Sequence, residues 1–229
     1  MDMGFIQKIG SFWDIKISEE QAQKFSKYYS IIRQENKKYN LTRIENEKEV
    51  LEEHFLDPIK GYLMGIAMTS EELIDIGSGA GFPGIPLKIY IPELKLIMVE
   101  KTRKKTLFLK KVVRELGFDN VEIWPERAEI MGRSSKRETF DWVTARAVAP
   151  LPLTLEIALP LLQKGGYFWS FQGPSYEESF SESKKIYREC GAKVEEVIHY
   201  SLPVSLKKRA ILIFKKTEES RHLYPRHNS

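Results

Sequence analysis

The sequence contains a single cysteine, Cys190, and no long run of apolar residues. One cysteine cannot form an intrachain disulfide or a zinc site built from several thiolates. No apolar stretch approaches the roughly 20 residues that a membrane-spanning helix requires. The N-terminus also lacks the basic and apolar segments of a secretory signal peptide. We therefore expect a cytoplasmic protein that has no membrane partner and binds no metal.

The sequence also does not have the composition that is typical of a disordered chain. Hydrophobic residues make up 42% of the 229 residues and charged residues 30%. This balance indicates one globular unit with a sizeable core. A net charge of +4 does not by itself indicate a polyanionic partner. Two local clusters are more informative: residues 101–111 contain six basic residues and no acid, and residues 207–209 read Lys-Lys-Arg.

The first 70 residues have the periodicity of helices. Ser18 and Gln21 form a capping box, and apolar residues follow at helical spacing. A second helical pattern extends from Glu47 to Ala67, and Pro58 predicts a break or a kink within it. We expect residues 1–70 to form an N-terminal helical cap.

Residues 71–217 alternate between short apolar runs and helical patterns. The candidate strands are Leu73–Ile76, Lys95–Val99, Val121–Trp124, Asp141–Ala145, Tyr167–Phe171, Lys193–His199 and Ala210–Phe214. The helical patterns between them are Pro83–Tyr90, Thr102–Leu116, Pro152–Leu162 and Tyr176–Cys190. This alternation predicts an α/β fold with a mostly parallel, Rossmann-like sheet of seven strands. The last two strands are too close in sequence for a parallel crossover, so the seventh should run antiparallel. Residues 218–229 would form a C-terminal tail.

A glycine-rich turn follows the first candidate strand, in the sequence L-I-D-I-G-S-G-A-G-F-P-G at 73–84. Gly77, Gly79 and Gly81 allow positive φ, and without a Cβ they let a ligand lie against the backbone. The turn is at the carboxyl end of a strand, where open α/β sheets bind their ligands. The pattern therefore favours a ligand site over an empty turn.

Two ligands compete for this turn. The spacing of Gly79, Gly81 and Gly84 matches G-x-G-x-x-G, which is typical of dinucleotide binding. Asp75 opposes that interpretation, because a carboxylate at the strand end would repel a pyrophosphate. The same carboxylate could accept a hydrogen bond from an ammonium group, directly or through water. S-adenosylmethionine carries an ammonium and a sulfonium but no phosphate, so it is the favoured ligand.

Four further residues are candidates for the pocket. Glu100, at the end of the second strand, could hold the ribose hydroxyls of either ligand, and it also suits the start of the following helix. Ala128 and Glu129 follow the third strand and could contact an adenine. Arg146 ends the fourth strand, and its guanidinium could bind a methionine carboxylate or an RNA phosphate.

These motifs together resemble the bacterial 16S ribosomal RNA guanine-N7 methyltransferases, also called glucose-inhibited division protein B. The resemblance rests on Y-N-L-T at 39–42, H-F-L-D at 54–57, D-I-G-S-G-A-G-F-P-G-I-P-L at 75–87, R-A-V-A at 146–149 and Y-P-R at 224–226. It implies the class I S-adenosylmethionine-dependent methyltransferase fold. The residues it assigns to S-adenosylmethionine are Gly77, Phe82, Ala128, Glu129 and Arg146. Such proteins often have lysine before the glycine after the fifth strand, where this chain has Gln172-Gly173.

The resemblance also implies the substrate, one guanine in the decoding-region loop of 16S rRNA within the small subunit or its precursor. Guanine N7 has a free lone pair at neutral pH, so methyl transfer requires alignment and no obligatory general base. His54 and Asp57, three apart on a helix, are then expected to be a structural pair.

Contacts to the RNA are expected from several residues. Lys104, Lys105, Arg146 and Arg209 are the candidates for phosphate contacts. An unstacked guanine could stack on Phe82, Trp169 or Phe171, although aromatic residues at strand ends usually belong to the core. We expect the protein to act as a monomer.

Three other functions are compatible with parts of this pattern. A small-molecule methyltransferase would share the cofactor core and differ in the N-terminal cap. A nicotinamide-dependent oxidoreductase would use the glycine turn for a dinucleotide. A non-catalytic RNA-binding module would use only the basic clusters.

Overall fold

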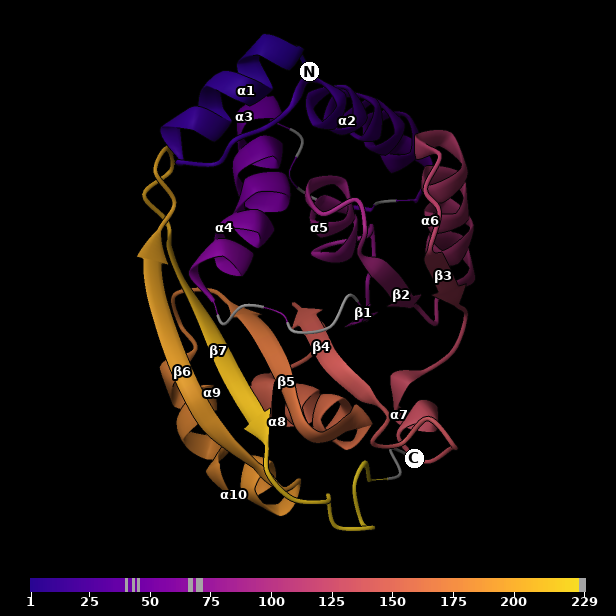
Figure 1. The fold of residues 1–229 in the computed structure, drawn as a ribbon, viewed down its shortest axis with the longest axis vertical. Helices are drawn as coiled ribbons and strands as arrows, with labels where there is room; N and C mark the ends of the chain where they lie inside the picture. The colour runs from indigo at the N-terminus through magenta and orange to yellow at the C-terminus, as the bar shows by residue number, and fades with distance from the viewer. Residues whose placement is uncertain (40, 43, 45, 66–67, 69–71, 227–229) are drawn as a thin grey trace.

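The computed structural model describes residues 1–39, 41–42, 44, 46–65, 68 and 72–226 (Figure 1). Within these residues a seven-stranded sheet has the order β3-β2-β1-β4-β5-β7-β6. The strands are β1 (Glu72–Ile76), β2 (Lys95–Val99), β3 (Val121–Trp124), β4 (Phe140–Arg146), β5 (Leu162–Gln172), β6 (Ala192–Ser201) and β7 (Lys208–Lys216). The first five strands are parallel, and β7 runs antiparallel to both β5 and β6. The predicted antiparallel last strand is confirmed.

Helices cover both faces of the sheet (Figure 1). The N-terminal helices are α1 (Met3–Phe12), α2 (Glu19–Tyr39), α3 (Glu47–Glu49), the π-helix η1 (Val50–Leu56) and α4 (Asp57–Met64). The remaining helices are α5 (Gly84–Tyr90), α6 (Arg103–Leu116), α7 (Ala128–Met131), α8 (Leu151–Ala158), the 3-10 helix η2 (Leu159–Leu161), α9 (Glu177–Glu182) and α10 (Lys184–Glu189). None of the described helices is long and apolar enough to cross a membrane.

Two hydrophobic cores lie on opposite faces of the sheet. Successive strand residues alternate between them, as Leu73 and Ile74 do in β1. The first core joins the sheet to the N-terminal helices and to α5 and α6. The second joins it to the helices from α7 to α10. The N-terminal cap therefore shares a core with the sheet, and its side chains can reach the carboxyl ends of the strands.

Local sequence signals explain how the cap begins. The predicted capping box is present, because the Ser18 amide donates to Gln21 Oε1 at 2.8 Å and the Gln21 amide donates to Ser18 Oγ at 3.1 Å. The apolar stripe of α2 is buried, and Tyr28 reaches the glycine turn, where its hydroxyl donates to the Ala80 carbonyl. The predicted boundary at residues 70–71 lies outside the described residues, as does Asn40 of the Y-N-L-T motif.

The helix around Pro58 does not stop at the proline. It changes there from the π-helix η1 to the α-helix α4, and the Asp57 amide donates to the Glu52 carbonyl five residues back. In the same pattern the next amide would bond to the Glu53 carbonyl, but residue 58 is proline and has no N–H. Pro58 therefore leaves the Glu53 carbonyl available to a donor from elsewhere.

The described part of the C-terminal segment is packed against the protein. Arg226 forms an ion pair with the buried Glu156 of α8 at 2.6 Å. Tyr224 donates to Glu189 at 2.6 Å, and Arg137 donates to the carbonyl of Tyr224 at 2.6 Å. The Y-P-R motif thus fixes the end of the chain to the helices below the sheet.

Candidate cofactor and substrate site

The glycine turn connects β1 to α5 at the carboxyl edge of the sheet. Gly77, Gly79 and Gly81 have φ of +67°, +60° and +96°. A Cβ on Gly77 would lie 2.7 Å from Val148 Cγ2, and one on Gly81 would lie 2.5 Å from Ile85 Cγ1. The nearest atom to a Cβ on Gly79 would be the Gly77 carbonyl oxygen at 3.8 Å. Two of these glycines are required by packing, and Gly79 leaves open space where a ligand could lie.

Most amides of this turn are already used within the protein. Those that donate to protein acceptors are the amides of Gly77, Ser78, Gly79, Gly81, Phe82 and Gly84. A pyrophosphate needs such amides as free donors. The structure therefore argues against a dinucleotide at this turn and against the nicotinamide-dependent alternative.

Asp75 lies beneath the turn and is fully buried. Its Oδ2 accepts from the Gly84 amide at 3.3 Å, whereas its Oδ1 has no hydrogen-bond partner. Burial raises the pKa of Asp75 to about 7. An unpartnered buried acceptor fits a ligand that brings a hydrogen-bond donor or a positive charge, as the ammonium of S-adenosylmethionine would.

Glu100 connects the turn to the start of α6. Its Oε2 accepts from the Gly79 amide at 3.0 Å, and its Oε1 accepts from the Thr102 amide at 2.7 Å. The side chain thus acts at the helix start, which was one of its two predicted roles. Each carboxylate oxygen has a second lone pair that could accept from a ribose hydroxyl. That contact stays a prediction.

A cavity of about 180 Å³ opens beside the turn. Its lining includes four of the predicted cofactor residues, Gly77, Glu100, Ala128 and Glu129. Val148 from the β4–α8 loop closes one side, and Lys105 of α6 lies at another. The structure thus brings together residues from the ends of β1, β2, β3 and β4. An adenosine with its ribose toward Glu100 fits this arrangement of groups.

Arg146 does not extend freely into solvent at the end of β4. Its Nη1 donates to the Glu53 carbonyl at 2.6 Å, the acceptor left free by Pro58. Its Nη2 lies 2.6 Å from His54 Nδ1, and its Nη1 lies 3.6 Å from Asp57 Oδ2. The guanidinium is therefore held on the π-helix η1 and the start of α4.

The protonation of His54 follows from this contact. Arginine can only donate, so Nδ1 must accept and the ring proton must be on Nε2. Nε2 lies 2.9 Å from Thr42 Oγ1 and donates to it. Burial, together with the charge of Arg146, lowers the pKa of His54 to about 2, so the ring is neutral at physiological pH. His54 is fully engaged in holding Arg146 and is not placed to act as a base.

His54 and Asp57 do not pair with each other, contrary to the expectation from their spacing. Each of them instead contacts Arg146. The network includes Thr42 of the Y-N-L-T motif and both ends of H-F-L-D, so three separate sequence motifs meet at one guanidinium. Sequence periodicity could not find this convergence, because it depends on how the cap packs against β4.

A second cavity, of about 370 Å³, lies on the other side of Arg146. Asp57, Tyr200 and Arg209 line it together with the ends of β4 and β5. Asp57 Oδ1 accepts from the Tyr200 hydroxyl at 2.6 Å, and Arg209 Nη2 donates to Glu53 Oε2 at 2.8 Å. Sequence reasoning missed Tyr200 and Glu53, since neither belongs to a recognisable motif.

The two cavities meet at Ala147, which lines both of them. Ala147 has φ of +54°, a conformation that residues other than glycine seldom adopt. Such strain is often found at functional positions, and here it turns the chain between the two spaces. Ala147 therefore lies between the two cavities and borders each of them.

The other predicted residues have diverse surroundings. Phe82 is buried, stacks on His54 with a centroid distance of 4.3 Å, and does not line either cavity. Trp169 is also buried away from both cavities, whereas Phe171 lines the second one. Lys104 is exposed at the start of α6, and Arg209 is mostly covered by its ion pair with Glu53.

Comparison with known proteins decides the family. The profile of rRNA small subunit methyltransferase G matches residues 21–211 of this chain. The chain belongs to this family. A ribosomal RNA small subunit methyltransferase G from Carboxydothermus hydrogenoformans is 41% identical over 93% of this chain and 90% of its own length. The protein of that name from Listeria monocytogenes (strain EGD-e) is 37% identical over 93% of this chain and 90% of its own length.

Solved structures confirm the fold class. TYW2 from M. jannaschii, solved in complex with AdoMet, has a TM-score of 0.55 at 16% identity, covering 76% of this chain and 79% of its own. The YcgJ protein from Bacillus subtilis has a TM-score of 0.53 at 16% identity, covering 72% of this chain and 100% of its own. The fold is that of the class I S-adenosylmethionine-dependent methyltransferases, as the sequence predicted, here with an N-terminal helical extension.

Gly79 offers a direct test of the glycine turn. We expect Gly79→Ala to reduce affinity for S-adenosylmethionine at least tenfold, because the new methyl group projects into the open space beside the turn. Gly117→Ala is the matched control. Gly117 has φ of +62° with no atom within 4 Å, at the far end of α6. Both variants should lose about 1 kcal/mol of stability from the left-handed conformation.

Isothermal titration calorimetry with S-adenosylmethionine measures the cofactor affinity, and urea unfolding measures the stability. Equal cofactor affinity in the Gly79→Ala and Gly117→Ala proteins would show that the ligand does not approach Gly79.

The raised pKa of Asp75 predicts a pH dependence of stability. The folded protein keeps a proton on Asp75 up to about pH 7, whereas the unfolded chain releases it near its ordinary value of 3.8. The free energy of unfolding should therefore fall as the pH rises from about 4 to 7, by at most about 1.4 kcal/mol per pH unit. Asp75→Asn should remove this contribution. Urea unfolding at several pH values measures it, and parallel curves for the two proteins would contradict the assignment.

Proposed function

We propose that this protein transfers a methyl group from S-adenosylmethionine to N7 of a guanine in 16S rRNA, in the small ribosomal subunit or its precursor. The observation that carries the proposal is the meeting of two cavities at Ala147 in a member of this family. One cavity has the groups that suit a nucleoside. The other is lined by basic and polar side chains that suit a nucleobase in RNA.

The first cavity would hold the cofactor through residues of four strand ends. Glu100 would accept the ribose hydroxyls, Ala128 and Glu129 would border the adenine, and Gly79 would lie beneath the ligand. Asp75 is fully buried and lines neither cavity, so it would act on the ammonium group from beneath the turn and not by direct contact. The cofactor supplies an electrophilic methyl group on a cationic sulfur.

The second cavity would receive the guanine with N7 toward Ala147. The O6 atom beside N7 is a hydrogen-bond acceptor, and adenine carries an amino group at the same place. Arg209 borders this cavity, and its Nε is 3.6 Å from Asp57 Oδ2, too long for a hydrogen bond. An arginine donor toward O6 would favour guanine and disfavour adenine.

The protein need not remove a proton in this reaction, because N7 attacks with a free lone pair and the product is a cation. This agrees with the site, where His54 is neutral and bonded on both ring nitrogens. Arg146 would act by position, because its contacts with the cap hold the β4–α8 loop that separates the two cavities. Catalysis would come mainly from alignment at about 3–3.5 Å between the reacting atoms.

The test maps N7-methylguanosine in 16S rRNA by borohydride reduction and aniline cleavage. Small subunits or their RNA from cells without this protein are incubated with the purified protein and S-adenosylmethionine. We expect one new cleavage site, in the decoding-region loop, that depends on the cofactor. Methyl transfer to a different atom of the RNA would refute the N7 assignment, and transfer only to small metabolites would favour the small-molecule alternative.

A further inference from the structure

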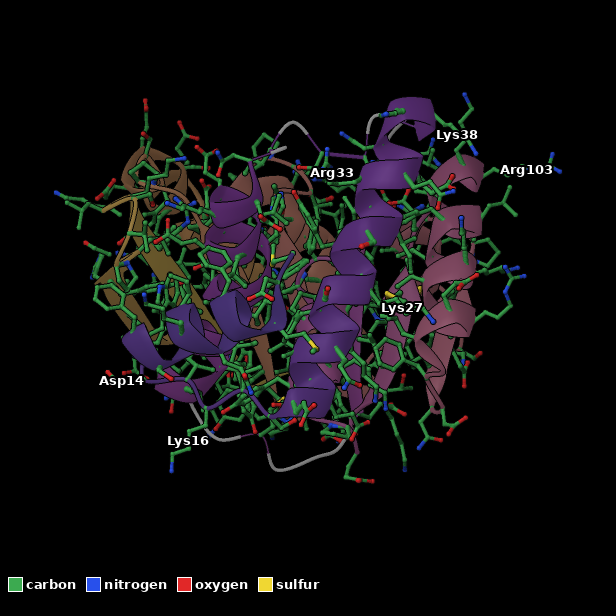
Figure 2. The ribbon with its side chains drawn as sticks, turned by 90° about the horizontal axis from the view of Figure 1, so that it is seen from above. Asp14, Lys16, Lys27, Arg33, Lys38 and Arg103 are labelled. Atoms are coloured by element: carbon green, nitrogen blue, oxygen red, sulfur yellow. The ribbon has the colours of Figure 1, made fainter. Side chains whose placement is uncertain are left out.

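Helices α2 and α6 lie side by side and antiparallel on the outside of the molecule (Figure 2). Lys27 of α2 donates to the Glu115 carbonyl near the end of α6, and Lys111 of α6 donates to Glu35 of α2 at 2.8 Å. The last turn of α2 therefore lies beside the first half of α6. Figure 2 shows Lys38 and Arg103 at this same end of the two helices.

Exposed lysine and arginine side chains lie together at this end of the helix pair. We call this region the α2–α6 surface, and its exposed members are Lys38 of α2 and Arg103 and Lys104 of α6. After Glu20, the only acid in α2 is Glu35, which is 6% exposed on its side chain and paired with Lys111. Helix α6 contains no acid between residues 103 and 114.

The cations of this surface are largely unneutralised. Lys38 lies 3.8 Å from the buried Glu35, which is already bonded to Lys111. Among the described residues, Arg103 and Lys104 have no carboxylate within 4.0 Å. Like charges on one surface repel one another, and this repulsion is relieved when a polyanion binds.

The surface also leads to the cofactor cavity. Helix α6 begins three residues after Glu100, and Lys101 and Lys105 line the cavity beside the glycine turn. The exposed cations continue from there to Arg103 and Lys104 of α6, and Lys38 of α2 lies at the same end of the helix pair (Figure 2). A polyanion that places one group at the site could extend along this path.

We propose that the sugar-phosphate backbone of the RNA next to the target guanine docks on the α2–α6 surface. The inference rests on the proposed function and adds the surface that holds the substrate. It gives the N-terminal cap a role in substrate binding, because Lys38 belongs to α2. RNA is the partner that fits, since regularly spaced phosphates match a row of separate lysines and arginines.

The test compares two triple variants of the full-length protein with equal changes in net charge. One carries Lys38→Glu in α2 together with Arg103→Glu and Lys104→Glu in α6. The control carries Lys184→Glu, Lys185→Glu and Arg188→Glu in α10, an exposed basic helix on the opposite side of the sheet (Figure 1). Binding of protein-free 16S rRNA is measured by filter retention at several salt concentrations.

We expect the α2–α6 variant to bind RNA at least tenfold more weakly than the control at 0.1 M salt. Its plot of log affinity against log salt should be shallower by about 2, because each lost phosphate contact removes about 0.7 to 0.9 from the slope. Both variants should bind S-adenosylmethionine like the wild type and have similar melting temperatures, which shows that they are folded.

Equal RNA binding by the two variants would overturn the proposal, since only net charge would then matter. Normal binding of free RNA with loss of methylation only in assembled subunits would also overturn it, and would indicate a protein partner. Failure of the proposed function is seen separately, as an absence of methyl transfer to RNA by the wild-type protein.

Discussion

Replacing Arg146 with alanine is expected to reduce methyl transfer to rRNA to less than 1% of the wild-type rate. The change should also lower the free energy of unfolding by about 3–5 kcal/mol, the usual cost of leaving a buried charge without its partner. Without Arg146, the Glu53 carbonyl and His54 Nδ1 lose their donor, and Asp57 loses one of its two nearby cations. The β4–α8 loop, which separates the two cavities, would then lose its connection to the cap.

Arg146→Lys separates position from charge. Lysine keeps the cation near Asp57, but a single ammonium cannot reproduce the planar fork that reaches Glu53 and His54 together. We expect Arg146→Lys to be more stable than Arg146→Ala. Its kcat should stay far below that of the wild type, and its affinity for S-adenosylmethionine should change little. Urea unfolding, cofactor titration and single-turnover methylation measure the three quantities.

Arg114→Ala is the control, because Arg114 is exposed on α6. A lysine variant with wild-type kcat would show that the fork is not required.

The second large effect is expected from Arg226→Ala, which should destabilise the protein by about 3 kcal/mol. The carboxylate of Glu156 is 1% exposed and accepts three hydrogen bonds from Arg226, from its amide at 2.6 Å, Nε at 2.9 Å and Nη2 at 2.6 Å. The alanine variant keeps only the amide, so a buried charge remains without a cation. Thr154 and Ile157 of α8 line the two cavities, so loosening α8 should also weaken cofactor binding.

Two further variants test the cause of that destabilisation. Adding Glu156→Gln to Arg226→Ala removes the unpaired charge and should recover part of the lost stability. Arg221→Ala removes an exposed ion pair with Glu189 from the same segment and should change stability by less than 1 kcal/mol. Urea unfolding of the four proteins provides the comparison. If Arg226→Ala lowered the free energy of unfolding no more than Arg221→Ala does, the C-terminal segment would not be holding α8.

Much of the fold is determined by local patterns. The strands β2 and β3 have the predicted bounds, and the other strands extend the predicted ones by a few residues. Alternating apolar residues produce this agreement, because each strand must present side chains to both cores. The short connection before β7 decides its direction for a similarly local reason. The glycine turn can also be predicted locally, because a positive φ at those positions favours glycine whatever the rest of the fold is.

The site could be predicted only in part. Gly77, Glu100, Ala128 and Glu129 border one cavity because parallel strands end at the same edge, so topology alone brings them together. The surroundings of Arg146 could not be predicted in this way. Its partners come from residues about 90 positions earlier in the chain, and the acceptor at Glu53 exists because a proline follows a π-helix.

Local sequence patterns were enough to predict the class of sheet, the direction of its last strand and the residues around the glycine turn. Periodicity and backbone restriction act within a few residues, so they can be read along the chain. Three further features depend on the complete fold: residues of two motifs hold the arginine of a third, two cavities border Ala147, and Lys38 of α2 lies at the same end as the first cations of α6. These features arise from packing between distant segments, whose relative placement depends on the complete core.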